Sequence, residues 1–343
     1  MWKLSVIIIV VFILPLLVRK IERNLEIFLF IMGVLAVTAS RVWDRQLIYA
    51  ALVDPIKISV AVLVAGLTFR WVRDHIRLSI DIAMRRLGIK WFFFLTVVFL
   101  GALSSVITVI IASLILVEIV SGMKVDKSAE INFVIIACFS LGLGAALTPI
   151  GEPLSTIAIA KLNGFPHFAD FWFLLKLLGW YILPGILVLG LLAVFIKPKL
   201  TGHTALREDH PETIKDIFIR TGKIYIFVMG LIFLGSGFKP IIDAYIAEMP
   251  AKGLYWLNMV SAILDNATLT AAEITPKMDI AHIRAVLMGL LISGGMLIPG
   301  NIPNIIAAGK LKISNRAWAR LGIPLGIALM LGYFVLLFLY KIG

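Results

Sequence analysis

The chain has 343 residues, of which 61% are hydrophobic and only 15% charged, and its mean hydropathy is +1.02. Soluble domains contain about 45–50% apolar and about 25% charged residues, so this composition excludes an ordinary soluble enzyme, a disordered chain, a coiled coil and a disulfide scaffold. The formal net charge of +12 comes from basic clusters between apolar stretches, as in the cytoplasmic loops of membrane proteins. No separate basic domain favours nucleic-acid binding. The composition predicts an all-α polytopic membrane protein.

Because a membrane-spanning helix needs about 20 mostly apolar residues, we predict about eight crossings. In chain order they are residues 2–18, 25–40, 55–72, 131–147 with a continuation to 162, 170–196, 222–239, 283–309 and 318–340. Residues 74–88 mix charged and apolar side chains, which favours a helix lying along the membrane surface. Two more apolar stretches, 91–121 and 254–275, are each interrupted near the middle by polar residues. We predict that these two are re-entrant helical hairpins, which enter and leave the membrane on the same side.

The distribution of basic residues predicts the orientation. The chain holds 32 Lys and Arg, and most of them fall on one side when loop 19–24 is placed in the cytoplasm. That side then also receives loops 70–90, 122–130, 197–223 and 310–320. Cytoplasmic loops are rich in Lys and Arg, so we expect both termini to lie outside a prokaryotic cell membrane. The expected parts are two N-terminal transmembrane helices (1–45), a first repeat (55–196), a cytoplasmic linker (197–221) and a second repeat (222–343).

Segments of the two halves resemble each other in the same order along the chain. Residues 66–74 resemble 235–243, residues 102–108 resemble 262–268, and residues 150–162 resemble 299–311. Each half is then a helix, a hairpin, a broken helix and a helix, which makes an odd number of crossings. The second half must therefore be inverted in the membrane relative to the first. Inverted repeats with paired helix interruptions are typical of secondary transporters.

Polar residues interrupt the apolar helices at four places: the hairpin tips 104–108 and 265–268, and the helix breaks 148–153 and 299–304. Backbone groups cannot stay unpaired in lipid, so a break at membrane depth must line a protein-buried or water-filled cavity. Prolines that flank a glycine remove hydrogen-bond donors and unwind the helix. The freed carbonyls and nearby side chains offer oxygen ligands to a small cation. The predicted binding residues are Ser104, Ser105, Thr108, Thr148, Gly151, Ser155, Asn266, Thr268, Asn301 and Asn304, together with the acids Glu152 and Asp265.

Two carboxylates lie inside interruptions, Glu152 in the first half and Asp265 in the second. An ionised carboxylate costs a few kcal/mol at the bilayer centre, so it is usually functional there. We expect both acids to bind a transported Na⁺ and to exchange it for protons by competition. Two alternatives stay open: Asp265 as a helix cap at the hairpin tip, and Glu152 as a hydrogen-bond partner of the broken backbone. Glu118 is expected in a solvated place near a loop, and Glu273 in a peripheral or gating place.

Three motifs carry a resemblance to a known superfamily: Gly-Ala-Ala-Leu-Thr-Pro-Ile-Gly-Glu-Pro at 144–153, Ser-Ala-Ile-Leu-Asp-Asn-Ala-Thr at 261–268 and Pro-Gly-Asn-Ile-Pro-Asn at 299–304. In these motifs the chain resembles the ion transporter superfamily, in particular sodium/proton antiporters of the NhaD type and a related family of uncharacterised prokaryotic proteins grouped with cation transporters. The resemblance covers about residues 55–340. It implies inverted repeats, hairpins that meet broken helices, and often a homodimer with elevator-like movement. The antiporters carry an Asp-Asn pair at the first tip, where this chain has Ser104 and Ser105.

The expected function is therefore secondary transport of a small inorganic cation, Na⁺ or Li⁺, in exchange for protons and without a cofactor. The alternative is Na⁺-coupled or uncoupled transport of a small anion or carboxylate, which the neutral tip 104–108 would suit. An enzyme is not expected, because the sequence has no His-Glu-x-x-His motif and its five histidines fall in predicted loops or at helix ends. The expected partners are the cation, protons, the lipid bilayer and, as an option, a second copy in a homodimer; nucleic acid is not expected.

Overall fold

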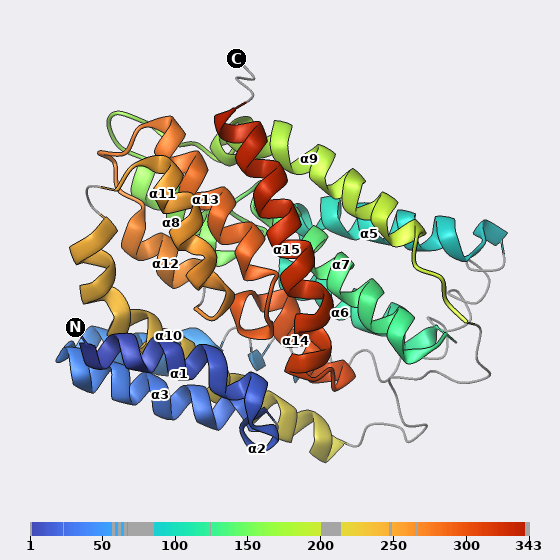
Figure 1. Ribbon diagram of the computed structural model, residues 1–343, viewed down its shortest axis with the longest axis horizontal. Coiled ribbons are helices and arrows are strands. Elements are labelled where there is room, and N and C mark those ends of the chain that lie inside the picture. Colours follow the sequence, from blue (N-terminus) through green and yellow to red (C-terminus); the bar gives the residue numbers. More distant parts are fainter. Residues whose placement is uncertain are drawn as a thin grey trace.

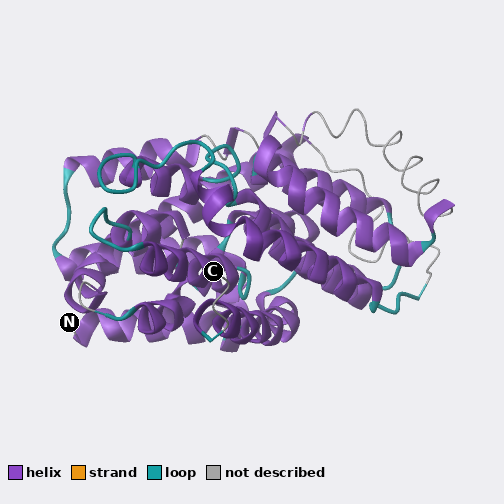
Figure 2. Cartoon of the chain, turned by 90° about the horizontal axis from the view of Figure 1, so that it is seen from above, coloured by secondary structure: helices purple, strands orange, loops and turns teal. Residues whose placement is uncertain are grey.

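The structure is a computed structural model, and every regular element in its described residues is a helix (Figure 1). Figure 2 shows the same described residues from above, as helices joined by loops. The described residues are 2–22, 24–56, 59–60, 63–64, 67, 86–123, 125–199, 214–246, 249–264 and 266–339. The prediction of an all-α protein is confirmed for these residues.

Long apolar helices alternate with short ones along the chain. In order, the helices are α1 (Trp2–Leu17), α2 (Arg19–Glu22), α3 (Leu25–Ser40), α5 (Ile89–Ile107), α6 (Val109–Gly122), α7 (Lys127–Ala145), α8 (Pro153–Leu162), α9 (Phe173–Val194), α10 (Ile214–Ile246), α11 (Ala251–Leu257), the 3₁₀ helix η1 (Asn258–Ala262), α12 (Asn266–Glu273), α13 (Ile280–Gly294), the 3₁₀ helix η2 (Ile298–Gly300), α14 (Ile302–Leu311) and α15 (Asn315–Phe338).

Five helices in the described part of the chain are long and apolar enough to cross a membrane. They are α5, α7, α9, the part Ile217–Pro240 of α10, and α15. Large apolar side chains point outward from several of them: Trp180 of α9 is 82% exposed and Phe99 of α5 is 64% exposed. Contiguous apolar surface is rare on soluble monomers and marks contact with a partner or with lipid. These helices are compatible with a multi-pass membrane protein.

One side of the molecule is a layer of α1, α3 and α10 (Figure 1). Helices α3 and α10 pack along each other at positions where no side chain fits. A Cβ atom on Gly33 would lie 2.7 Å from the Gly230 carbonyl oxygen, and one on Gly237 would lie 2.6 Å from the Cβ of Ala36. Such small residues let helix backbones approach closely, as is common between membrane helices.

The remaining helices form two groups of the same make-up. Helices α5, α7 and α9 pack on one another, and so do α11, α13 and α15. Two short helices belong to each group, α6 and α8 in the first and α12 and α14 in the second. These short helices cross over between the groups, because α6 packs against α14 and α8 packs against α12. The two groups are therefore joined through their short helices.

The predicted interruptions coincide with helix ends. The stretch 91–121 is divided at Thr108 into α5 and α6, and the stretch 254–275 is divided into α11, η1 and α12. The two helices predicted to be broken end after Ala145 and Gly294 and resume at Pro153 and Ile302. The sequence therefore predicts where the regular backbone stops in both groups.

Two other predicted segments compare differently with the structure. Helix α10 begins at Ile214, inside the range predicted as a linker, because the apolar face of the helix extends to the fully buried Ile217. Residues 74–85 of the predicted surface helix and much of the predicted crossing at 55–72 lie outside the described residues.

Candidate functional site

The first interruption is a single residue between two helices. Thr108 separates α5 from α6 and has a φ of 72°. A β-branched residue in this left-handed region is strained, and residues held in such conformations cluster at functional sites. The Thr108 side chain caps α6 by accepting a hydrogen bond from the Ile111 N–H at 3.5 Å. Thr108 therefore forms a turn with strained backbone at the predicted hairpin tip.

The first helix break lies directly against this tip. The Thr148 hydroxyl donates to the Ser105 carbonyl, and the Val109 N–H donates to the Gly151 carbonyl at 2.8 Å. The Ser104 hydroxyl donates to the Leu141 carbonyl of α7 at 3.0 Å. These bonds join the end of α5, the start of α6 and the unwound segment after α7 into one buried unit.

Close backbone packing in this unit depends on glycine. A Cβ atom on Gly144 would fall on the carbonyl oxygen of Gly101, and one on Gly151 would fall on the carbonyl oxygen of Ala145. No L side chain fits at either place without a shift of backbone. The Gly-x-x-x-x-x-x-Gly spacing of residues 144–151 is therefore required by the packing of the break.

The second break is built in a similar way. The Asn304 amide nitrogen donates to the carbonyls of Gly294 and Leu297, both at 2.8 Å. With its amide nitrogen turned toward the break, Asn266 at the start of α12 donates to the Gly300 carbonyl at 3.2 Å and to the Leu290 carbonyl at 3.1 Å. The second tip thus contacts the second break, as the first tip contacts the first.

The two breaks match residue by residue. Glu152 and Asn301 each precede a ten-residue helix with a proline in its first turn, and both have extended backbones, with φ and ψ of −153° and 161° for Glu152 and −151° and 149° for Asn301. The Ser155 hydroxyl bonds the Ala145 carbonyl at 3.4 Å, just as Asn304 bonds the carbonyl ten residues before it. The sequence alignment of 150–162 with 299–311 therefore pairs residues with the same local geometry.

The two matched positions differ in charge. Asn301 is 4% exposed and caps α14 by accepting from the Ile302 N–H at 2.8 Å. Glu152, 5% exposed, occupies the same position on α8 without such a cap from its side chain. A carboxylate at a helix N-terminus is stabilised by the partial positive charge of the helix dipole. The first break therefore places a buried acid at the end of an unwound backbone segment.

The end of helix α7 lies between the first tip and the second break. A Cβ atom on Gly142 would meet the amide nitrogen of Asn301, while Leu141 and Gly144 of the same turn contact the first tip. The Cys138 thiol lies 3.6 Å from the Pro303 carbonyl, one helical turn away. The end of α7 is therefore contacted by the first tip and by the second break.

The predicted binding residues fall into three sets. The first tip and break unite Ser104, Ser105, Thr108, Thr148, Gly151, Glu152 and Ser155, and the second break unites Asn266, Asn301 and Asn304. Asp265 and the side chain of Thr268 lie outside the described residues. In the part that the structure describes, no three His, Cys, Asp or Glu side chains come together, so the oxygen ligands offered to a cation are carbonyls, hydroxyls, amides and the Glu152 carboxylate.

The expectation for Glu118 is wrong. This residue is 6% exposed rather than solvated, and its carboxylate binds the ammonium of Lys310 at 2.9 Å. The partner comes from α14, 192 residues away, which the sequence could not reveal. Lys161 and Lys310 occupy the same position near the ends of α8 and α14, but this equivalence does not identify Glu118 as the partner of Lys310.

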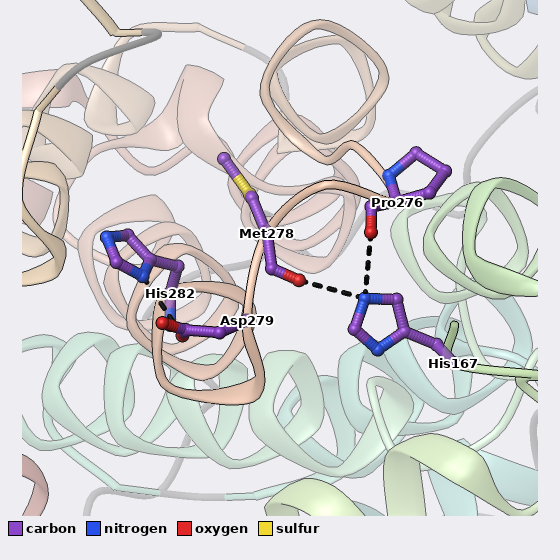
Figure 3. Close-up of polar contacts among 5 residues, drawn as sticks. All are labelled: His167, Pro276, Met278, Asp279 and His282. Atoms are coloured by element: carbon purple, nitrogen blue, oxygen red, sulfur yellow. Dashed lines mark hydrogen bonds and ion pairs between the residues drawn. The ribbon is translucent and has the colours of Figure 1, made fainter. Parts of the chain in front are cut away.

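Loops of the two groups also meet (Figure 3). His167, between α8 and α9, lies with Nε2 at 3.2 Å from the Pro276 carbonyl and 2.8 Å from the Met278 carbonyl. Two carbonyls accept, so this nitrogen carries the proton. In the α12–α13 loop, which carries Pro276 and Met278, Asp279 caps α13 by accepting a hydrogen bond from the His282 N–H at 2.8 Å. The α8–α9 and α12–α13 loops thus lie at the same end of the molecule.

A comparison with curated proteins gives no match. A match does extend over almost the whole chain for a family described as "Protein of unknown function (DUF1646)", which aligns with residues 1–340. The chain, with its two matched helix breaks, belongs to this family.

Proposed function

We propose that this protein is a secondary active cation transporter, which exchanges Na⁺ or Li⁺ for protons across a prokaryotic cell membrane. The observation that carries the proposal is the matched pair of buried helix breaks. In each break a polar residue directly precedes a ten-residue helix, and the tip of an interrupted helix contacts the break. Discontinuous helices whose unwound carbonyls coordinate Na⁺ or H⁺ form the binding sites of secondary transporters. This is also what the resemblance to the ion transporter superfamily implies.

Contacts between loops support two inverted repeats and re-entrant hairpins. In the proposed topology, loops 122–130 and 197–223 lie in the cytoplasm, while loops 163–170 and 274–279 lie outside. Asp126 binds the Lys199 N–H at 2.7 Å, which joins two cytoplasmic loops. His167 contacts the Met278 carbonyl, which joins two outer loops. Each contact thus connects loops that the proposal assigns to the same side.

The proposed cation site uses Glu152 and Asp265, with neutral oxygen ligands from the tips and breaks. Glu152 is the last residue of the first break, and Asp265 directly precedes Asn266, which contacts the second break. A buried carboxylate is costly when ionised and alone. Either a proton or a monovalent cation neutralises it, so the two compete for the same oxygens. Exposure of the site to one side at a time turns this competition into exchange.

The proposal is tested with purified protein in liposomes that contain a pH dye. Addition of outside Na⁺ or Li⁺ is expected to move protons in wild-type vesicles. Glu152→Gln and Asp265→Asn should each lower this rate by at least about tenfold, which corresponds to about 1.4 kcal/mol. Asp170→Asn is the matched control, because this exposed loop carboxylate contacts only the exposed Lys176 and the nearby Trp172 N–H among the described residues.

Two other outcomes would contradict the proposal. Uptake of labelled Na⁺ with no proton movement would show a cation carrier that is not coupled to protons. Transport of a labelled carboxylate, with no response to any cation, would favour the anion transporter of the same superfamily and would remove the role assigned to the two acids.

A further inference from the structure

Glu273 is a buried acid outside the proposed cation site. It is the last residue of α12 and is 2% exposed. Neither carboxyl oxygen has a hydrogen-bond partner among the residues that the structure describes. Burying an ionised carboxylate in this way is costly, and such a group usually becomes neutral by binding a proton. The carboxyl therefore needs a neutralising partner that the described contacts do not supply.

The side chain of the neighbouring Asn258 has an oxygen atom without a hydrogen-bond partner among the described residues. Asn258 of η1 lies beside Glu273 and is fully buried. Its amide nitrogen donates to the Val286 carbonyl at 3.2 Å, while its Oδ1 atom has no partner in the described structure. If Glu273 is ionised, only the Asn258 amide nitrogen, which already donates to the Val286 carbonyl, can donate to it, and Asn258 Oδ1 stays without a partner. A protonated Glu273 has an O–H group that can donate to Asn258 Oδ1.

The charges around α12 act on this acid in opposite directions, because the helix end favours the neutral form and nearby cations favour the ionised form. A negative charge at the last residue of a helix is opposed by the partial negative charge of the helix C-terminus. On α8, the Lys161 ammonium donates to the Ile274 carbonyl at 3.2 Å and lies near Lys239 of α10. On α13, His282 pairs with Asp279 and Arg284 lies over the ring of Tyr181.

The other group of helices shows a different way to neutralise such an acid. Glu118 of α6 is buried and pairs with Lys310 of α14 at 2.9 Å. Helix α12 packs against α8 as α6 packs against α14, yet no such pair to Glu273 is found among the described residues. One acid is thus balanced by a fixed ammonium, whereas the other is left for a mobile charge.

From these observations we propose that Glu273 is a proton-binding site, which holds an exchangeable proton in a hydrogen bond to Asn258 Oδ1. Glu273 lies seven residues after Asn266, or about two helical turns from the second tip. The proton site therefore shares a helix with the second tip. This inference rests on the proposed function for its role, namely a proton taken up and released as the cation site changes sides.

The test is infrared spectroscopy of the full-length protein in lipid vesicles, with exchange from H₂O to D₂O. Wild type is expected to show the carbonyl absorption of a buried carboxylic acid, and this band should shift on exchange. In a Glu152→Gln, Asp265→Asn background, which removes the two acids of the proposed cation site, Glu273→Gln should remove the band. Glu26→Gln in the same background, which changes a control carboxylate bound to Lys223, should keep it. Asn258→Ala removes the acceptor and should move the band to the position of a free carboxylic acid.

The outcomes separate this inference from the proposed function. Loss of the band in Glu273→Gln supports the proton site, even if the vesicles transport no cation. An unchanged band in Glu273→Gln overturns the proton site, even if cation exchange is present. A shifted band in Asn258→Ala supports the hydrogen bond independently, if Glu273→Gln does not fold. An ionised Glu273 whose carboxylate signal responds to Lys161→Met also overturns the inference, because the acid is then neutralised by an ion pair.

Discussion

Asp126 is a single residue on which both a helix end and a loop contact depend. One carboxylate oxygen caps α7 by accepting from the Ala129 N–H at 3.3 Å, and the other accepts from the Lys199 N–H at 2.7 Å. Chiefly the hydrogen bond from Lys199 holds the pKa of Asp126 below its ordinary value. Because both bonds favour the ionised form, the carboxylate stabilises the folded state as long as it stays ionised.

The pH dependence of this contribution has a definite sign. The folded pKa is lower than the unfolded value of about 3.9, so the stabilisation is complete above the unfolded pKa and is lost as the pH falls through the folded pKa. Asp126→Ala is expected to lower the free energy of unfolding by about 1 kcal/mol near neutral pH. The difference from wild type should vanish in strong acid.

The measurement is the apparent melting temperature in detergent between about pH 7 and about pH 2, compared with the pKa of about 3.9 of a free Asp. Lys127→Ala, which changes the exposed neighbouring residue of the same helix, is the control and should follow wild type at every pH. A difference for Asp126→Ala that stays constant down to the lowest pH would contradict the assignment to the ionised carboxylate.

At the level of helices, the Glu118–Lys310 pair joins α6 to α14. The two side chains are 7% and 6% exposed, so neither charge is solvated. Removing one partner of a buried pair leaves the other charge uncompensated, which costs far more than the pair itself contributes. The pair therefore fixes which helices meet rather than supplying a large net stability.

This argument predicts a strong non-additivity. Lys310→Met alone and Glu118→Leu alone should each lower the free energy of unfolding by about 3–5 kcal/mol, whereas the double substitution should be close to neutral. The measurement is a double-mutant cycle of denaturant unfolding in detergent, monitored by the fluorescence of the native tryptophans. Additive losses in the double variant would show that each side chain acts through packing alone.

The same pair shows how far sequence reasoning reaches at this scale. The helix breaks follow from local chemistry, since proline and glycine inside an apolar run stop a helix wherever the run is placed. The positions of Glu152 and Asn301 at helix starts were predictable for this reason, whereas the tip at Thr108 was predicted from its run of polar residues. The partner of Glu118 was not, because Lys310 approaches it only after α6 and α14 have packed together. Long-range pairs depend on the assembled fold, which one sequence does not reveal.

At the level of the whole molecule, the two helical groups are built alike and joined by crossed short helices. Helix α6 of the first group packs on α14 of the second, and α12 of the second packs on α8 of the first. Any two-fold relation between the groups makes equivalent elements exchange partners in this way, and the proposed inverted repeats are one such relation. In the proposed inverted arrangement, the orientation of each group also determines on which side of the membrane its loops lie.

Loop accessibility therefore tests the inverted arrangement. In a Cys138→Ala background, which removes the single native cysteine, cysteines at Gly164 and Lys277 should react with a membrane-impermeant maleimide in intact cells. Cysteines at Lys127 and Lys312 should react only after the cells are permeabilised. All four positions are exposed in the structure, so a difference in labelling reports the side of the membrane rather than burial.

The pairing of the sites makes the result decisive. Residues 164 and 277 belong to the two loops that His167 ties together, and they lie in different halves of the chain. Two halves in the same orientation would place equivalent loops, 164 and 312, on one side and would separate 164 from 277. Labelling of 164 together with 312 would thus contradict the inverted repeats and, with them, the topology on which the proposed exchange depends. If only positions 164 and 277 are labelled in intact cells, each half must cross the membrane an odd number of times. That arrangement lets one buried site face both sides in turn.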